Sequence, residues 1–327
     1  MNVAEKTRTV AEFTRVEHTL FALPFAFMGA VLAAGGVPDL TVLFWVFVGL
    51  VGGRSASLMI NDIVDEPIDA ANPRTDGRPL PSGRLSKAEA YLLVGVAAAV
   101  LFYSAYRINT TAFVLSPIIL VHAYVYPYTK RYTTAAHFVL GLNGSYAPIG
   151  GWIAVRGTDT ETVIGGLDEV AAYLGSLGYY PALVLGGALV FWYAGFDIIY
   201  AFQDVEFDRE QGLRSIPAVY GRGTARRMSA ACHGAMLVLL VGLVAWTGAA
   251  GFDAGVFGAG VVVAGALLVY EHVIAEHDIG KAFFTVNAVV SAALFFSLVA
   301  SVLLWRAVCS VRIGEVETED LGNTVRF

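Results

Sequence analysis

Long runs of apolar residues constrain the fold of this chain more than any other feature. Runs of roughly 17–25 apolar residues are long enough to cross the hydrocarbon core of a bilayer as a helix. Charged residues make up only 15% of the chain, against about 25% in a typical soluble domain. The sequence therefore predicts an all-α, polytopic membrane protein. Nine spans are expected, near residues 19–36, 40–60, 89–106, 111–127, 135–155, 179–202, 228–250, 254–273 and 282–305.

Lysine and arginine are distributed unevenly between the two sides that these spans define. One side holds fifteen of them: Lys6, Arg8, Arg15, Arg74, Arg78, Arg84, Lys87, Lys130, Arg131, Arg209, Arg214, Arg222, Arg226, Arg227 and Lys281. The other side holds five: Arg107, Arg156, Arg306, Arg312 and Arg326. Cytoplasmic loops carry the excess of these residues in membrane proteins. The N-terminus is therefore predicted to be cytoplasmic and the C-terminus to lie outside, in the plasma membrane of a prokaryote.

Charge and cysteine content argue against several other classes of protein. The formal net charge is only −6, and no basic stripe indicates a nucleic-acid partner. No segment indicates an obligate protein partner. The apolar spans are expected to be surrounded by the lipid bilayer. Cys232 and Cys309 lie in or beside apolar runs without metal-ligand or redox spacing, and we interpret them as packing residues. The connection 156–178 is expected to be either a plain loop or a short interfacial helix.

Acidic residues gather in two segments, each where a span meets a predicted cytoplasmic loop. Five lie in 61–76 and five in 197–210. In each segment, two aspartates four positions apart precede an arginine and a turn rich in Gly, Pro and Ser: Asp65 and Asp69, then Asp204 and Asp208. This shared plan indicates a diverged internal duplication. We expect a single membrane domain, 1–327, with related halves at about 1–155 and 179–306 and a polar, disordered tail at 307–327.

The spacing of these acids favours a metal-assisted phosphate site. Residues four apart share a helix face, so Asn61, Asp65 and Asp69 are expected to form one stripe. Asp197, Asp204 and Asp208 are expected to form a second. The prolines of "DEP" and "NPR" are expected to end the first helix near Asp69. Carboxylates on one stripe repel, and Mg²⁺ removes that repulsion by binding one or two carboxylates together with substrate phosphates.

Bases surround the two acidic stripes and suit a diphosphate, because an arginine fork bonds two phosphate oxygens at once. The candidates are Arg74, Arg78, Lys130, Arg131 and Arg214. The alternative is ordinary solvated charge at a membrane surface. Two copies of one pattern on the same side of the membrane favour the phosphate site over that alternative.

Four stretches of the sequence resemble a known family, the UbiA-type membrane prenyltransferases. NDIVDEPIDAANPRTDGRPLPSG (61–83) resembles the first signature of this family, and DIIYAFQDVEFDREQGLRSIP (197–217) resembles the second. YPYTKR (126–131) and HFVLGLNGSYAPIGGWIAV (137–155) match the segment between the two signatures. The resemblance covers nearly the whole chain except the 156–178 loop and the tail. It implies nine transmembrane helices in a bundle around a central cavity that cytoplasmic loops cap.

The resemblance also implies a reaction. An isoprenyl diphosphate binds through Mg²⁺, its allylic C–O bond ionises, and an aromatic carbon attacks the carbocation. The implied catalytic and metal-binding residues are Asn61, Asp65, Asp204 and Asp208, with Asp69 as an outer member. The implied neutralising residues for the leaving diphosphate are Arg74, Arg78, Lys130 and Arg131, with Arg214 beside them. The expected acceptor-binding residues are Arg15, Arg54, Tyr128, Tyr200 and Asp197, and Arg54 stands out because a charge inside a span needs a partner.

The acceptor class is less constrained than the donor class. RVEHTLFALPFAFMGAVLA (15–33) and AFFTVNAVVSAALFF (282–296) look most like the quinone-biosynthesis branch, which prenylates 4-hydroxybenzoate or a hydroxynaphthoate. A second hypothesis keeps the donor and transfers geranylgeranyl to a glycerol phosphate lipid or a porphyrin. A third is an ion-coupled secondary transporter with an ion site at broken helices. Mg²⁺-dependent product formation, as opposed to ion-coupled uptake, separates the enzyme from the transporter.

Overall fold

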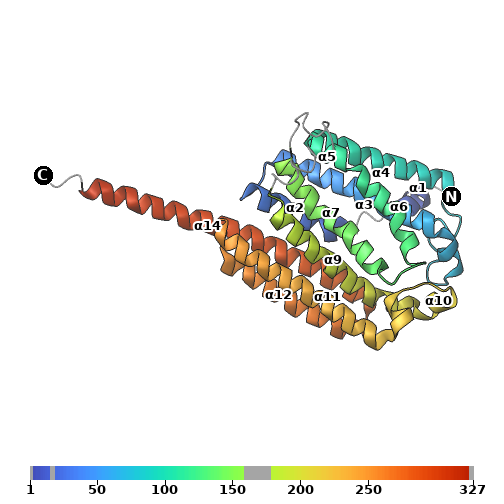
Figure 1. The fold of residues 1–327 in the computed structure, drawn as a ribbon. Helices are drawn as coiled ribbons and strands as arrows, with labels where there is room; N and C mark the ends of the chain where they lie inside the picture. Colours follow the sequence, from blue (N-terminus) through green and yellow to red (C-terminus); the bar gives the residue numbers. More distant parts are fainter. Residues whose placement is uncertain (1–2, 15–18, 158–177, 324–327) are drawn as a thin grey trace, which may run out of the picture.

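Helices form all of the regular structure in the residues that the computed structural model describes, which are 3–14, 19–157 and 178–323 (Figure 1). The helices are α1 Val3–Thr14, α2 Thr19–Ala34, α3 Leu40–Ala71, α4 Lys87–Ile108, α5 Thr110–Leu115, α6 Pro117–Thr129, α7 Ala136–Arg156, α9 Tyr180–Tyr200, η3 Ala201–Asp204, α10 Val205–Glu210, α11 Ile216–Ala249, α12 Ala254–Ile274, α13 Ile279–Lys281, η4 Ala282–Val286 and α14 Asn287–Asn323. The prediction of an all-α chain is confirmed.

The predicted membrane spans agree closely with these helices. Within the described ranges, eight helical segments are long and apolar enough to cross a membrane. The first predicted span, α2, has 16 residues, which corresponds to about 24 Å at 1.5 Å per residue. The predicted span 111–127 is divided into α5 and α6 at Pro117, because proline cannot donate the backbone hydrogen bond that would continue α5.

Helix α3 is much longer than its predicted apolar span. It has 32 residues, or about 48 Å, so its last turns extend beyond a hydrocarbon core of about 30 Å. We expected the prolines of DEP and NPR to end it near Asp69; α3 continues through Pro67 and ends at Ala71, directly before the Asn72–Pro73 turn. Near the end of a helix, proline removes only one of the remaining hydrogen bonds. Asp69 therefore stays on the same helix as Asn61 and Asp65.

Two expectations, about the second acidic stripe and about the tail, are wrong. A 3₁₀ turn, η3, separates α9 from α10, and its three residues per turn change the helical register. Asp197 is thus on a different element from Asp204 and Asp208, so the predicted second stripe does not include it. The tail was expected to be disordered from residue 307, but α14 continues to Asn323, since no proline interrupts it and Glu and Arg favour helix.

The centre of the bundle is built by α9, which packs most extensively on α7 and α11. Trp192 and Leu189 of α9 are fully buried in a core that also includes residues of α2, α12 and α14. Helices α2 and α7 cross at glycines. A Cβ atom at Gly151 would collide with the Ala26 carbonyl, and one at Gly29 with the Pro148 carbonyl. Small residues are what allow membrane helices to approach this closely.

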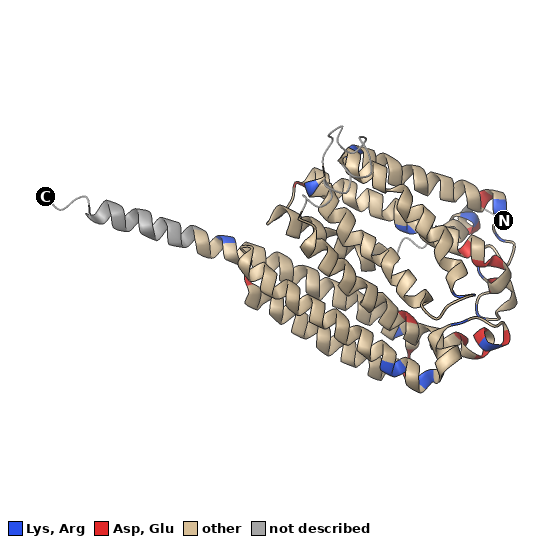
Figure 2. Ribbon diagram, viewed as in Figure 1, with Lys and Arg blue, Asp and Glu red and all other residues tan. Residues whose placement is uncertain are grey.

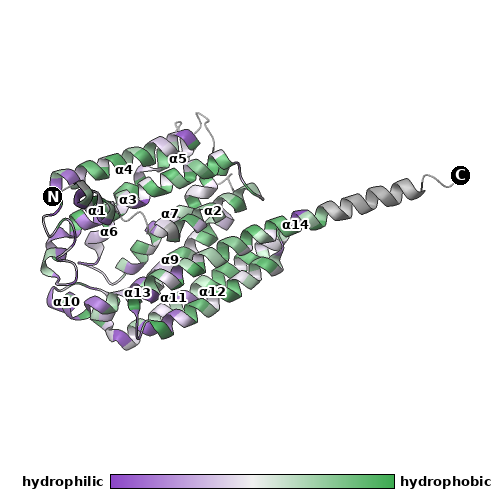
Figure 3. Ribbon diagram, turned by 180° about the vertical axis from the view of Figure 1, so that it is seen from behind, coloured by the Kyte–Doolittle hydropathy of each residue, from purple (hydrophilic) through white to green (hydrophobic). Residues whose placement is uncertain are grey.

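Charge and hydropathy divide the molecule along the bundle axis. Lysine, arginine, aspartate and glutamate gather mainly at the end that carries α1, α10 and the neighbouring loops (Figure 2). The helix surfaces away from that end are mostly hydrophobic (Figure 3). Large apolar side chains such as Leu40, Val238 and Val262 are more than 70% exposed there, as lipid-facing residues would be. The candidate site lies at the charged end.

Candidate active site

The end of α3 presents one row of acids to the charged loops. Asn61 Nδ2 donates a hydrogen bond to Asp65 Oδ2 at 3.2 Å, and Asp65 is 3% exposed. Arg78 lies 2.7 Å from Asp69 Oδ2 and 3.5 Å from Asp62 Oδ1. The predicted stripe of Asn61, Asp65 and Asp69 is therefore present, and the loop that follows α3 folds back over it.

The second acidic segment contacts the first through Arg74. Its Nε lies 2.8 Å from Asp204 Oδ1 and its Nη2 lies 2.5 Å from Asp204 Oδ2, which is a bidentate pair. Asn72 Nδ2 also donates to Asp204 Oδ1, at 3.0 Å. Burial alone would lower the pKa of Arg74, but the hydrogen bonds and charge of Asp204 outweigh it and raise that pKa. The two acidic segments, far apart in sequence, thus lie side by side with a permanent cation between them.

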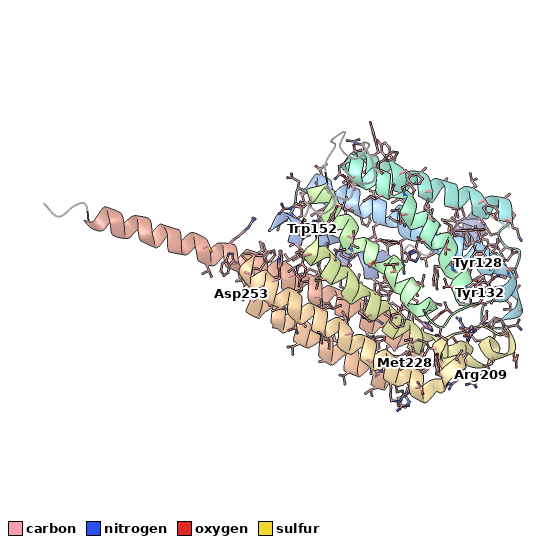
Figure 4. All side chains as sticks on the ribbon, in the orientation of Figure 1. Tyr128, Tyr132, Trp152, Arg209, Met228 and Asp253 are labelled. Atoms are coloured by element: carbon pink, nitrogen blue, oxygen red, sulfur yellow. The ribbon has the colours of Figure 1, made fainter. Side chains whose placement is uncertain are left out.

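The loop between α6 and α7 supplies two further bases. Lys130 Nζ lies 2.5 Å from Asp65 Oδ2 and also interacts electrostatically with Asp208. Arg131 lies 4.0 Å from Asp65 Oδ1, and its guanidinium stands over the Tyr128 ring at 4.9 Å. Arg214 donates its backbone N–H to the Lys130 carbonyl at 2.8 Å, while its side chain is exposed. Tyr128, Tyr132 and Arg209 lie at this end, opposite Trp152 and Asp253 (Figure 4).

Asp208 on α10 and Asp197 on α9 each lie within hydrogen-bond distance of a neighbouring side chain. Asp208 accepts a hydrogen bond from Ser215 Oγ at 2.5 Å. Asp197 Oδ2 lies 2.6 Å from His137 Nδ1, and the other ring nitrogen accepts from the Ile216 N–H at 3.2 Å. Because Ser215 and Ile216 are adjacent, the start of α11 fixes both groups.

An apolar cavity of about 260 Å³ opens inside the bundle next to these groups. Small and aliphatic residues of α2, α3, α4 and α7 form most of its wall, and Arg54, Ser57 and Tyr193 are among its polar members. The Arg54 guanidinium stands over the Tyr193 ring at 5.6 Å, and its Nε is buried without a hydrogen-bond partner. Asn61 follows Ser57 by one turn of α3. The cavity and the charged cluster are therefore contiguous along that helix.

The oxygen donors of the cluster suit a hard divalent cation that arrives with phosphate. Asp65 Oδ1 is buried and accepts no hydrogen bond. Across the described ranges, no three His, Cys, Asp or Glu side chains are clustered as a metal cage. Mg²⁺ rarely needs such a cage, because one or two carboxylates plus substrate phosphates and water complete its shell. The donor set fits Mg²⁺ bound together with a diphosphate.

Comparison with known proteins decides the family. The model of the UbiA prenyltransferase family matches residues 22–282. A 4-hydroxybenzoate octaprenyltransferase from Shewanella sp. (strain ANA-3) is 31% identical over 228 residues, which cover 68% of this chain and 72% of that protein. This chain belongs to the UbiA prenyltransferase family. The prediction of a membrane prenyltransferase is confirmed.

Solved structures of UbiA homologues share the fold. The apo structure of a UbiA homologue from Aeropyrum pernix K1 has a TM-score of 0.75 and 33% identity, covering 87% of this chain and 98% of that one. A UbiA homologue from Archaeoglobus fulgidus bound to DMAPP and Mg²⁺ has a TM-score of 0.59 and 20% identity, covering 89% and 98% of the two chains. At that identity the second likeness concerns the fold alone.

Most of the sequence-predicted site residues come together in this UbiA-family structure. Asp197 lies on α9 against His137. Tyr128 points its hydroxyl to Tyr124 at 3.4 Å, and Arg15 lies outside the described residues. The prediction missed three residues that contact the acids, Asn72, His137 and Ser215, and also Tyr193, which contacts Arg54. His137 and Ser215 fall within the stretches that resemble the family, so the resemblance could have identified them as candidate site residues.

Proposed function

We propose that the protein transfers a polyprenyl group from an isoprenyl diphosphate to an aromatic acid of the 4-hydroxybenzoate or hydroxynaphthoate type, with Mg²⁺, in quinone biosynthesis. The observation that carries this proposal is the contact between two acidic segments and their bases beside an apolar cavity that contains Arg54. The name of the Shewanella relative supports the acceptor class. The DMAPP and Mg²⁺ of the Archaeoglobus homologue support the donor and the metal.

We assign the metal–diphosphate site to both halves of the chain. Asn61, Asp65, Asp204 and Asp208 would hold the Mg²⁺, with Asp69 as an outer member. Arg74, Arg78, Lys130 and Arg131 would bind the diphosphate oxygens, and Arg214 would act from the rim. When the diphosphate binds, the Arg and Lys side chains that now pair with aspartates would pair with phosphate oxygens, and the aspartates would bind Mg²⁺. Each buried charge would then keep a partner of opposite sign throughout binding.

The proposed reaction depends on positive charges that are already in place around the diphosphate site. When bound, Mg²⁺ would neutralise negative charge on the leaving diphosphate. The fork of Arg74 and the ammonium of Lys130 stabilise the charge that builds on the diphosphate as the allylic C–O bond breaks, because fixed cations in a dry site need little reorganisation. The apolar cavity wall holds the prenyl chain and excludes the water that would trap the carbocation. Tyr200 and Tyr128 present aromatic rings near the charged cluster.

The aromatic acid is assigned to the inner part of the cavity. Arg54 is a cation without a hydrogen-bond partner on its Nε, and an acceptor carboxylate would supply one. Asp197, one helical turn beyond Tyr193 on α9, is proposed to face the same acid. Arg15 remains a predicted second anchor for the acid.

The distribution of lysine and arginine supports an orientation for the whole chain. We propose that the N-terminus and the charged loops face the cytoplasm and that the C-terminus lies outside, in the plasma membrane of a prokaryote. We further propose that 1–327 is one domain with related halves, because Asp65 and Asp204 occupy matching places in the two acidic segments.

An acceptor panel tests the function. Purified protein would be given geranylgeranyl or longer diphosphates with Mg²⁺ and, in parallel, 4-hydroxybenzoate, a dihydroxynaphthoate or geranylgeranylglyceryl phosphate, with products read by mass spectrometry. We expect prenylation of an aromatic acid. A product formed only with the glycerol phosphate would keep the donor site and refute the acceptor class.

A further inference from the structure

Tyr146 brings a phenol to the wall of the apolar cavity that also contains Arg54. It lies on α7 and lines the cavity. The Tyr146 hydroxyl lies 2.7 Å from Nδ1 of His122 on α6, and Nε2 of the same ring lies 2.9 Å from the Val139 carbonyl oxygen. Three polar groups thus join α6 to α7 at the edge of the cavity.

The Val139 carbonyl determines the direction of both hydrogen bonds. A carbonyl oxygen only accepts, so Nε2 of His122 carries a proton. The two groups that bond the ring are uncharged, and His122 lies within a candidate span, where a charge needs a partner. The imidazole is therefore neutral, and Nδ1 accepts the Tyr146 O–H. Tyr146 Oη is left with only lone pairs to offer a ligand in the cavity.

The Tyr146 hydroxyl lies nearer to the charged end of the bundle than the Tyr146 backbone does. Helix α7 starts at that end, after the loop that carries Lys130 and Arg131, and helical side chains tilt toward the start of their own helix. The His122 ring bonds both Tyr146 Oη and the Val139 carbonyl, which is two turns earlier in α7. The hydroxyl is therefore near the level of Val139.

The Arg54 guanidinium lies farther from the charged end. It stands over the Tyr193 ring at 5.6 Å, and a Cβ atom at Gly144 would lie 2.5 Å from that ring, so the guanidinium is near the level of Gly144. From Val139 to Gly144 the distance along the α7 axis is about 7.5 Å. The cavity thus has a hydrogen-bond acceptor, Tyr146 Oη, on the side of the charged cluster and a cation farther in.

These two positions match the two polar ends of a hydroxylated aromatic acid. Its carboxylate would bind Arg54, and its ring hydroxyl would donate a hydrogen bond to Tyr146 Oη. The ring carbon beside a hydroxyl is electron-rich and is the one that attacks a carbocation. An acceptor bound in this way would present that carbon toward the charged cluster, where the prenyl diphosphate is proposed to bind.

Other hydroxyl groups on the cavity wall are less suited to this role. Ser104 and Ser116 donate to carbonyls of their own helical turns and also keep lone pairs. They lie near the end of α4 and at the break between α5 and α6, away from the charged end. Ser57 Oγ is buried without a hydrogen-bond partner, so it can donate as well as accept and would not distinguish a hydroxyl from an ether.

We propose that Tyr146 recognises a free ring hydroxyl on the acceptor and that His122 is its positioning residue. This inference rests on the proposed function, because it requires an aromatic acid in the cavity. Tyr146 Oη accepts the hydrogen bond of the substrate O–H, and His122 holds the tyrosine proton so that Oη cannot donate. The site thereby selects hydroxylated aromatic acids over their ethers.

Competition between two matched acids tests the assignment. Prenylation of 4-hydroxybenzoate would be followed with 4-methoxybenzoate as the competitor, which replaces the ring O–H by O–CH₃. In the wild-type protein the KM of the hydroxy acid should be about tenfold below the Ki of the methoxy acid, as one hydrogen bond allows. Tyr146→Phe should raise that KM about tenfold and leave the Ki unchanged. Tyr106→Phe, an exposed tyrosine on α4, is the control and should change neither constant.

His122 offers a matched pair of variants with the opposite signature. In His122→Leu the Tyr146 O–H is free to donate to the ether oxygen, so the Ki of the methoxy acid should fall about tenfold while the KM of the hydroxy acid is kept. In His122→Gln the amide can accept from Tyr146 and donate to the Val139 carbonyl, so the wild-type preference should return. Equal weakening of both acids in both variants would mean a merely structural role for His122 and would overturn its assignment.

Failure of this inference is distinguishable from failure of the proposed function. If the wild-type protein prenylates the hydroxy acid and Tyr146→Phe keeps the wild-type preference, only the role of Tyr146 is refuted. Loss of the preference in Ser57→Ala instead would assign the hydroxyl to α3 and also overturn the proposal. If the wild-type protein prenylates no aromatic acid, the proposed function and this inference are refuted together.

Discussion

Arg54 is a residue whose replacement should affect stability and activity in opposite directions. We predict that Arg54→Met will unfold less readily than the wild-type protein but will be poorly active. A charged side chain at membrane depth costs roughly 2.5–3.5 kcal/mol. The Arg54–Tyr193 contact at 5.6 Å offsets about 0.5–2 kcal/mol of that. The difference leaves roughly 0.5–3 kcal/mol in favour of the variant.

Arg54→Met should also weaken binding of the aromatic acceptor and leave binding of the prenyl diphosphate unchanged. A hydrogen bond to a charged group contributes about 1.5–3 kcal/mol. Losing it should raise the KM for the aromatic acid about 10- to 150-fold. The KM for the prenyl diphosphate should stay close to that of the wild type, since Arg54 lies in the cavity and not among the phosphate bases.

Thermal unfolding in detergent and initial rates against each substrate would measure both effects. Arg107→Met is the control, because Arg107 also stands over an aromatic ring, Trp45 at 4.9 Å, but is exposed at the other end of the bundle. We expect Arg107→Met to leave both KM values unchanged. The assignment of Arg54 to the acceptor would be refuted if Arg54→Met kept the wild-type KM for the aromatic acid. It would also be refuted if the variant raised the KM for the prenyl diphosphate instead.

Three further predictions concern the charged cluster. Asp65→Ala and Asp204→Ala should each abolish turnover while the protein remains inserted and folded, as measured by product yield and by size-exclusion chromatography; wild-type activity in either would refute the metal assignment. Arg74→Lys should raise the KM for the prenyl diphosphate about tenfold, because lysine cannot form the bidentate pair, whereas Lys87→Arg at an exposed ion pair should not. Chelation of divalent cations should stop turnover and added Mg²⁺ should restore it, with persistence of full activity in chelator as the contrary result.

Much of this fold could be predicted because membrane spans and paired acidic signatures are local patterns. The apolar runs gave the helices, and the repeated aspartates indicated which loops would meet. Helix ends were less predictable. The end of α3 near Asp69 was predicted from the two prolines, although Pro67 itself does not interrupt the helix. The 3₁₀ turn at Ala201–Asp204 was not anticipated, because it depends on tertiary contacts that a propensity cannot include.

The partners of the site residues were harder to predict than the residues themselves. Asn72 reaches Asp204 across 132 positions, and His137 reaches Asp197 across 60. Neither pair leaves a periodic signal in one sequence. Asp197 was grouped with Asp204 and Asp208 by spacing along a continuous helix, whereas the 3₁₀ turn after α9 places it on a different element.

The most direct measurement is the stoichiometry of inorganic diphosphate release by the wild-type protein. Prenyl diphosphate and aromatic acid would be supplied with and without Mg²⁺, and diphosphate and prenylated acid would be quantified together. We expect equal amounts of both, formed only when donor, acceptor and Mg²⁺ are all present. Diphosphate release without prenylated acid, or equal product formation in the absence of divalent cations, would contradict it.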